Sequence, residues 1–262
     1  MKVGIIGCGN LGVSILEGVT AKHPELEVFA SKRNTESIDH FSSGAVTITN
    51  NNEALIGACD ILIFALKPYT LLPFIQEHRH LLSSQRHTLV SAATGISIED
   101  IENAAGSGFG IFRAMPNTAA AVNESITAIA SNDDPLNRMK MVDDIFLGLG
   151  ATIHIEEKLM DAATILGACG IAYVLRFMRA MIQGGIEVGF DAQSATKIVS
   201  QTMKGASELI LQNGSHPEQE IDKVTTPKGC TIVGLNEMEH AGFSSALIKG
   251  IVASHDKIQD SE

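Results

Sequence analysis

Short apolar runs alternate with longer amphipathic stretches through the first half of the chain. Ile61–Ala65 is apolar at every position, which is typical of a strand that is buried on both faces. The pattern predicts strands at residues 3–6, 28–30, 46–49, 61–65, 88–91 and 111–113, and helices at 11–21, 52–58, 69–78 and 98–104. Strands that alternate with helices over short connections predict a doubly wound parallel sheet.

A strand at 125–130, a helix at 136–147 and a strand at 152–155 are expected to close this first domain. Beyond them the pattern is helical only, with helices predicted at 161–187, 191–211, 217–224, 231–239 and 244–257. Asp191 is a suitable N-cap for the second of these, and the polar tail after Ser254 is expected to fray. We therefore expect an α/β domain over residues 1–155 and an all-helical domain over residues 156–262.

The helix expected near Leu166–Ile186 is unusually apolar. Arg176 and Arg179 interrupt the apolar run, so the pattern favours a buried helix of a protein in solution over a membrane span. The apolar run at Met1–Ile6 is too short for a signal peptide. Because one small helical domain cannot readily cover so apolar a helix, the sequence predicts a homodimer.

Composition and charge argue against several classes of partner and site. The chain has 262 residues, of which 45% are hydrophobic and 19% charged, as in ordinary globular proteins. Its 19 Lys and Arg against 30 Asp and Glu give a net charge of −11, which argues against nucleic acid or an anionic membrane as partner. The 4 cysteines form no CxxC pair and the histidines are scattered, so we expect no metal site and reduced thiols in a cytoplasm.

The segment Gly7-Cys8-Gly9-Asn10-Leu11-Gly12 has the GxGxxG spacing between a predicted strand and a predicted helix. In that context the first glycine allows a tight turn, the second lets backbone approach a pyrophosphate, and the third lets helix and strand pack closely. The N–H groups at the helix start, including those of Asn10 and Leu11, then face the phosphates. The alternative is a structural strand–helix turn without a ligand.

The turn after the second strand discriminates between cofactors. It reads Ser31-Lys32-Arg33, with no carboxylate to bind a ribose 2′-hydroxyl or to repel a 2′-phosphate, and Glu27 comes too early to do so. A hydroxyl, an ammonium and a guanidinium at this turn favour NADPH, with NADH as the weaker alternative. The competing interpretation is a solvated basic turn.

Four further motifs follow the glycine loop along the chain. In order they are Ala65-Leu66-Lys67-Pro68, Ser91-Ala92-Ala93-Thr94-Gly95, Arg113-Ala114-Met115-Pro116-Asn117-Thr118 and Thr225-Thr226-Pro227-Lys228-Gly229-Cys230-Thr231. Together they resemble the pyrroline-5-carboxylate reductase family over nearly the whole chain. The resemblance implies an N-terminal Rossmann-type domain, a C-terminal helical domain that forms an intertwined dimer, and dimers that often assemble into larger rings. It also implies the reduction of 1-pyrroline-5-carboxylate, a cyclic imine acid, to L-proline.

The resemblance also assigns residues. It places Ala65, Lys67 and Pro68 beside the cofactor, and Met115, Pro116 and Asn117 at a turn that faces the nicotinamide. It places the substrate carboxylate at the loop that contains Thr226, Gly229, Cys230 and Thr231. Thr231 is then the candidate catalytic residue, since its hydroxyl can bond the carboxylate or help to protonate the ring nitrogen.

Some positions depart from the family pattern. Lys228 replaces a glycine, Cys230 replaces a threonine, and Gly167–Ile171 lacks two serines and a proline found there in the family. The cofactor half is therefore closer to the pattern than the substrate half. Two alternatives stay open, namely a regulatory paralogue that binds the nucleotide without turnover, and a reductase of a related cyclic imine or a keto acid.

Overall fold

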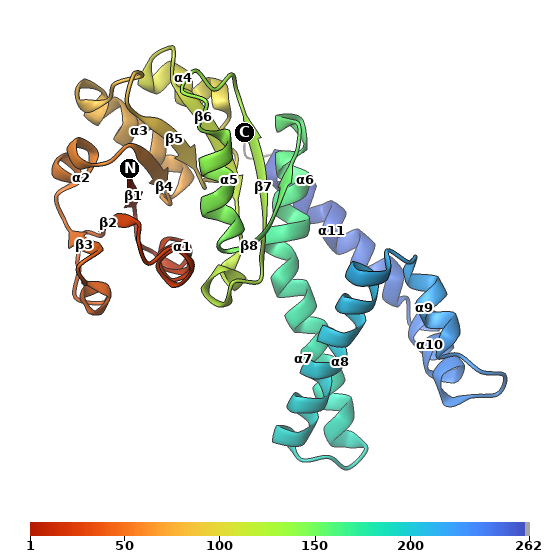
Figure 1. Cartoon of the computed structure of the whole chain (residues 1–262). Coiled ribbons are helices and arrows are strands. Elements are labelled where there is room, and N and C mark those ends of the chain that lie inside the picture. Colours follow the sequence, from red (N-terminus) through yellow and green to blue (C-terminus); the bar gives the residue numbers. More distant parts are fainter. Residues whose placement is uncertain (260–262) are drawn as a thin grey trace. The chain divides into compact units, whose positions relative to one another are not determined.

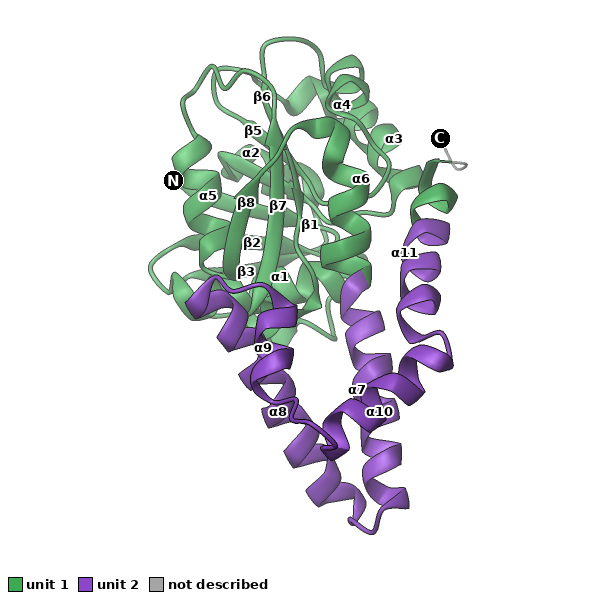
Figure 2. Ribbon diagram, turned by 90° about the vertical axis from the view of Figure 1, so that its right-hand side faces the viewer, with its two compact units in different colours: residues 1–169, 255–262 green, residues 170–254 purple. Residues whose placement is uncertain are grey.

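The computed structural model describes residues 1–259, which divide into two compact units. Unit 1 contains Met1–Cys169 and the described residues from His255 onward, and unit 2 contains Gly170–Ser254 (Figure 2). The division falls inside one long helical segment rather than at the predicted position between residues 155 and 156.

Unit 1 is built on one sheet of eight strands in the order β3-β2-β1-β4-β5-β6-β7-β8 (Figure 1). The strands are β1 (Lys2–Ile6), β2 (Glu27–Ser31), β3 (Val46–Thr49), β4 (Ile61–Phe64), β5 (Thr88–Ser91), β6 (Gly110–Met115), β7 (Ser125–Ser131) and β8 (Gly150–His154). The first six pair in parallel, and β1 and β4 are neighbours at the point where the strand order reverses. The predicted doubly wound sheet is therefore confirmed.

Helices cover both faces of this sheet. The helices of unit 1 in chain order are α1 (Asn10–Lys22), α2 (Asn52–Ala58), α3 (Pro68–His78), α4 (Ile98–Ala105), α5 (Met139–Leu147) and α6 (Met160–Ala163). One core cluster joins the strands to α1 and α5 through buried residues such as Leu16 and Phe146. A second joins them to α2, α3 and α4 through residues such as Leu55, Leu71 and Ile101. Burial on both faces explains why the central strands are continuous apolar runs.

One pair of strands in the sheet is antiparallel. β7 runs antiparallel to β6, a direction that the sequence pattern did not predict. The connection is a short 3-10 helix, Thr118–Val122, followed by Asn123 in the left-handed region with φ 58°. A parallel pair needs a crossover of roughly a dozen residues or more, and this connection is too short to provide it.

Unit 2 consists of helices, as predicted. They are α7 (Gly170–Glu187), α8 (Ala192–Asn213), α9 (Pro217–Lys223), α10 (Cys230–His240) and α11 (Phe243–Gln259), the last of which ends in unit 1. The Asp191 carboxylate accepts hydrogen bonds from the N–H groups of Gln193 and Ser194, so the predicted N-cap is confirmed. The predicted fraying after Ser254 is wrong as far as Gln259, because α11 continues to that residue.

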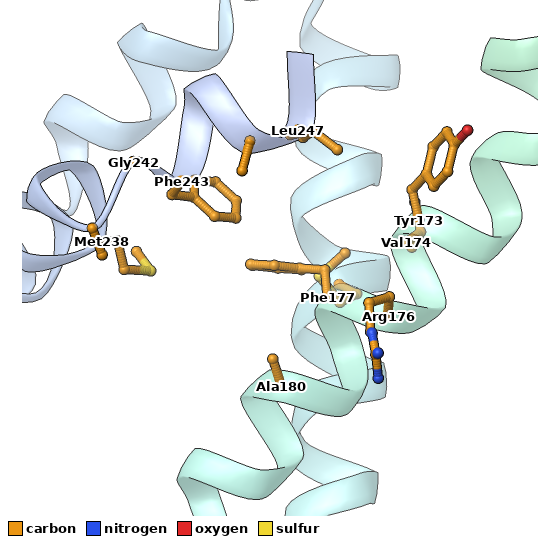
Figure 3. A pocket seen from close by; sticks show the side chains of 12 residues that line it. Tyr173, Val174, Arg176, Phe177, Ala180, Met238, Gly242, Phe243 and Leu247 are labelled. Atoms are coloured by element: carbon orange, nitrogen blue, oxygen red, sulfur yellow. The ribbon is translucent and has the colours of Figure 1, made fainter. Parts of the chain in front are cut away.

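The helices of unit 2 bury little of their apolar surface. Of the described residues of this unit, only Ala195 and Val199 are buried, and α7 contains none. The helix near Leu166–Ile186 is thus not covered within one chain, and its predicted burial requires the predicted second subunit. An apolar groove runs between α7, α10 and α11, where the Phe177 and Phe243 ring centroids lie 5.7 Å apart (Figure 3).

By length and composition alone, the helical segment Glu157–Glu187 could cross a membrane. Its exposed apolar side chains include Leu166, Leu175 and Ile186. A contiguous apolar surface of this kind marks an interaction site in a folded protein.

Candidate functional site

The predicted cofactor residues gather at one edge of the sheet of unit 1. The segments that contain them directly follow β1, β2, β4 and β6, and parallel strands end at the same edge. In open α/β sheets ligands bind at this edge, in the crevice where the strand order reverses. Here the reversal lies between β1 and β4, which carry the glycine loop and the Ala65–Pro68 segment.

The glycine loop has the geometry that a dinucleotide requires. Gly7 has φ +96°, and a Cβ there would lie 2.8 Å from the carbonyl oxygen of Ala65. A Cβ at Gly12 would lie 2.5 Å from the carbonyl oxygen of Gly7, so the third glycine lets α1 approach β1 closely. A Cβ at Gly9, in contrast, would have no neighbour within 4 Å. The space beside Gly9 is therefore open to a phosphate.

The start of α1 is free to bind an anion. No side chain caps it, and its first turn contains no acidic residue. The first N–H groups of a helix lack partners within the helix, and the helix dipole adds partial positive charge at that end. Asn10 and Leu11 present such N–H groups beside the open face of Gly9.

The turn after β2 separates the roles of its three residues. Ser31 is 3% exposed, and its carbonyl accepts hydrogen bonds from the N–H groups of Gly7 and Cys8 at 3.2 and 2.9 Å. Lys32 is half-buried and donates through Nζ to the Ser37 hydroxyl at 2.7 Å. Arg33 is exposed and forms no ion pair among residues 1–259. Ser31 thus braces the glycine loop, whereas the two cations are available to a ligand.

Cys8 lies inside the glycine loop but is completely buried. Burial raises the pKa of its thiol to about 11, which keeps the group protonated near neutral pH. The thiolate is the reactive form of cysteine, so Cys8 packs against the core and does not react.

Two further turns complete the edge. Lys67 is exposed at the N-cap position of α3, and Pro68 occupies the first helical position. Met115 ends β6, Pro116 and Asn117 follow it, and all three are buried. The Asn117 side chain accepts a hydrogen bond from the N–H of Ala119 at 2.9 Å and donates one to the carbonyl of Gly167 at 3.0 Å. This turn is therefore held rigidly.

The predicted substrate loop lies in unit 2 and leads into α10. Gly229 is the N-cap residue, and no side chain caps the start of this helix. A Cβ at Gly229 would lie 2.6 Å from the Thr226 hydroxyl and 3.0 Å from the Thr226 carbonyl oxygen, so a larger residue there would force Thr226 to shift. Lys228 has φ 60°, a conformation that suits the glycine of the family pattern.

The start of α10 therefore resembles the start of α1, because its first backbone N–H groups have no side-chain cap. Cys230 and Thr231 are its first two residues, and the Thr231 hydroxyl makes no hydrogen bond within the described chain. Cys230 is exposed and Thr231 is half-buried. Free N–H groups and a free hydroxyl at a helix start can bind a carboxylate.

Sequence reasoning missed one cluster of charges in unit 1. Arg113 is 6% exposed on β6, and its Nη1 lies 3.0 Å from Oε1 of Glu157 while its Nη2 lies 3.9 Å from Oδ1 of Asp161. Glu157 Oε1 also accepts a hydrogen bond from the N–H of Ile98 at 2.7 Å. An arginine inside an otherwise apolar strand was the available signal, since a buried charge requires a partner.

Comparison with known protein families finds a match in each half of the chain. Residues 157–261 match the family model of pyrroline-5-carboxylate reductase dimerisation. Residues 2–95 match the model described as NADP oxidoreductase, coenzyme F420-dependent.

Individual relatives extend over the whole chain. Pyrroline-5-carboxylate reductase 1 of Dictyostelium discoideum is 42% identical, over 97% of this chain and 49% of its own length, so this chain spans about half of that relative. Pyrroline-5-carboxylate reductase 2 of the same organism is 38% identical over 100% of this chain and 93% of its own. The crystal structure of Plasmodium falciparum pyrroline carboxylate reductase with NADP bound has a TM-score of 0.89 at 27% identity, covering 99% of this chain and 97% of that one. The chain therefore belongs to the pyrroline-5-carboxylate reductase family.

Proposed function

We propose that this chain reduces 1-pyrroline-5-carboxylate to L-proline with NADPH. The observation that carries the proposal is the start of α10, where Gly229 leads into free N–H groups and the free Thr231 hydroxyl. In a chain of this family that also has an open glycine loop, such a start provides the anchor that an imino acid needs. A nicotinamide cofactor follows from family membership, and the preference for NADPH is the finer part of the proposal.

The residues of unit 1 fit a dinucleotide. The open space at Gly9 and the free N–H groups of Asn10 and Leu11 suit the pyrophosphate. Lys32 and Arg33 suit a 2′-phosphate. The Ser31 carbonyl holds the glycine loop beside them through its hydrogen bonds to the N–H groups of that loop. Ala65, Lys67, Pro68, Met115, Pro116 and Asn117 complete the proposed edge. The bound nicotinamide would supply the hydride.

Imine reduction makes modest demands on the protein. A cyclic imine protonates readily, so the chain must hold the substrate, exclude water and deliver a proton to the ring nitrogen. In our proposal the N–H groups of Cys230 and Thr231 bind the carboxylate, with Gly229 and Thr226 shaping the loop. The Thr231 hydroxyl orients the substrate or donates the proton.

The exposed helices of unit 2 support a homodimer, in agreement with the dimerisation match over residues 157–261. A larger ring of dimers is a further part of the proposal. We also place the enzyme in the cytoplasm, because Arg176 and Arg179 sit within the apolar helix and the match favours a protein partner for it.

The direct test follows NADPH oxidation by the purified protein in the presence of 1-pyrroline-5-carboxylate and identifies proline as the product. We expect turnover with NADPH that exceeds turnover with NADH. Tight NADPH binding without turnover would support the regulatory paralogue, with the altered Gly167–Ile171 segment as its cause. Turnover only with a different cyclic imine or a keto acid would move the assignment to that substrate.

A further inference from the structure

A π-helical turn interrupts the long helix that begins at the end of unit 1. It covers Thr164–Cys169, between α6 and α7, and ends where the two units divide. Such turns are rare and occur frequently at functional sites. This one contains Gly167 and Cys169, which belong to the segment that departs most from the family pattern.

One side chain from the sheet fixes this turn. The Asn117 amide nitrogen donates to the Gly167 carbonyl at 3.0 Å, while its amide oxygen accepts from the N–H of Ala119 at 2.9 Å. The backbone N–H of Asn117 also donates to the Ser125 hydroxyl at 3.0 Å. Asn117 is 5% exposed, so both ends of its amide are used in a buried setting and its orientation is determined.

A second anchor holds the beginning of the same helical segment. Arg113, four residues before Asn117, pairs with Glu157 at 3.0 Å and lies 3.9 Å from Asp161. Two contacts from one stretch of β6 and its turn therefore hold residues 157–167. That stretch includes Met115 and Pro116, the turn proposed to face the nicotinamide.

We propose that Asn117 is a positioning residue, which fixes the π-helical turn at Gly167 against the turn beside the nicotinamide. This rests on the proposed function. The Asn117–Gly167 hydrogen bond would set the distance between this turn and the Met115–Asn117 segment that is proposed to face the nicotinamide. A misplacement of about 1 Å can cost on the order of 10²-fold in rate.

The test uses Asn117→Asp, which keeps an oxygen for the N–H of Ala119 and places an oxygen instead of a donor opposite the Gly167 carbonyl. We expect kcat with 1-pyrroline-5-carboxylate to fall by about ten- to a hundredfold and KM to rise. The Kd for NADPH is measured beside the kinetics, because Asn117 also belongs to the proposed cofactor edge, and the loss in kcat should exceed any loss in NADPH affinity. Backbone amides 167–172 should exchange deuterium faster.

Asn132→Asp is a matched control. The Asn132 amide also bridges backbone, accepting from the N–H of Ile111 at 2.8 Å and donating to the Phe109 carbonyl at 3.1 Å, at the opposite end of β6. This variant should lose comparable thermal stability yet keep the kinetics and the exchange at residues 167–172 of the parent. Equal kcat and KM in the two variants would overturn the proposal.

Failure of the proposed function can be recognised separately. If the unmodified protein does not turn over 1-pyrroline-5-carboxylate, the amide exchange still decides whether Asn117 holds the turn. Faster exchange at 167–172 in Asn117→Asp alone would support the anchoring, and unchanged exchange would overturn it.

Discussion

Arg33 is exposed in the turn after β2, and its guanidinium forms no ion pair with a carboxylate of the described chain. A guanidinium can form two parallel hydrogen bonds to a phosphate, and loss of such a charged contact costs about 1.5–3 kcal/mol. We expect Arg33→Ala to weaken NADPH binding by about ten- to a hundredfold, at about 1.4 kcal/mol per factor of ten. NADH lacks the 2′-phosphate, so its affinity serves as the internal control. Fluorescence titration with both cofactors measures the difference, and an equal loss for both would remove Arg33 from the phosphate site.

Thr231 differs from the other residues of its loop because it contributes a side-chain hydroxyl as well as an N–H group. We expect Thr231→Ala to lower kcat by about 10²-fold, the usual contribution of a positioned proton donor. Thr231→Ser should keep much of the activity because the hydroxyl remains. NADPH affinity should be normal in both variants, since the glycine loop belongs to unit 1. Steady-state kinetics that match the parent in Thr231→Ala would show that the hydroxyl has no role.

At the scale of elements, two glycines at the start of α1 have different roles: Gly12 allows close packing, and Gly9 faces the proposed ligand. A Cβ at Gly12 would lie 2.5 Å from the Gly7 carbonyl oxygen, so Gly12→Ala should displace α1 and lower both the melting temperature and NADPH affinity. A Cβ at Gly9 meets no protein atom within 4 Å, so Gly9→Ala should fold normally and lose affinity only. Thermal unfolding with and without NADPH distinguishes the two. A normal NADPH affinity in Gly9→Ala would place the pyrophosphate elsewhere.

The sequence predicted elements well where one physical pattern dominated. Continuous apolar runs located strands such as β4, and Asp191 located the start of α8, because burial and capping leave local signals. The antiparallel direction of β7 depended instead on the length and geometry of one connection. The π-helical turn at Thr164–Cys169 also has no local signature, since its contact with Asn117 joins residues 50 positions apart.

The candidate site was predictable to a similar degree. The glycine loop before α1 and the loop that leads into α10 followed from spacing and from the resemblance. The burial of Ser31 did not, because it depends on how β2 ends against the glycine loop. The partners of Arg113 were also hidden, since Glu157 and Asp161 approach it only after the chain folds. Long-range packing decided each of these.

At the scale of the whole molecule, the two units differ in how much of their apolar surface each buries within one chain. Unit 1 contains nearly all of the buried apolar side chains, in clusters on both faces of its sheet. Unit 2 buries only Ala195 and Val199 among its described residues, and large apolar side chains are exposed on α7, α8, α10 and α11. A helical unit with so small a core of its own needs a partner surface to be stable.

We therefore expect the protein to sediment as a dimer or larger assembly at micromolar concentration. Leu175 on α7 is 57% exposed within one chain, and a glutamate there would put a charge on the apolar surface that a second copy would cover. Leu175→Glu should accordingly shift the mass toward the monomer. Leu147 on α5 of unit 1 is 47% exposed and lies outside the dimerisation match, so Leu147→Glu should keep the mass of the parent. A monomeric parent, or equal dissociation of both variants, would contradict assembly through the helices of unit 2.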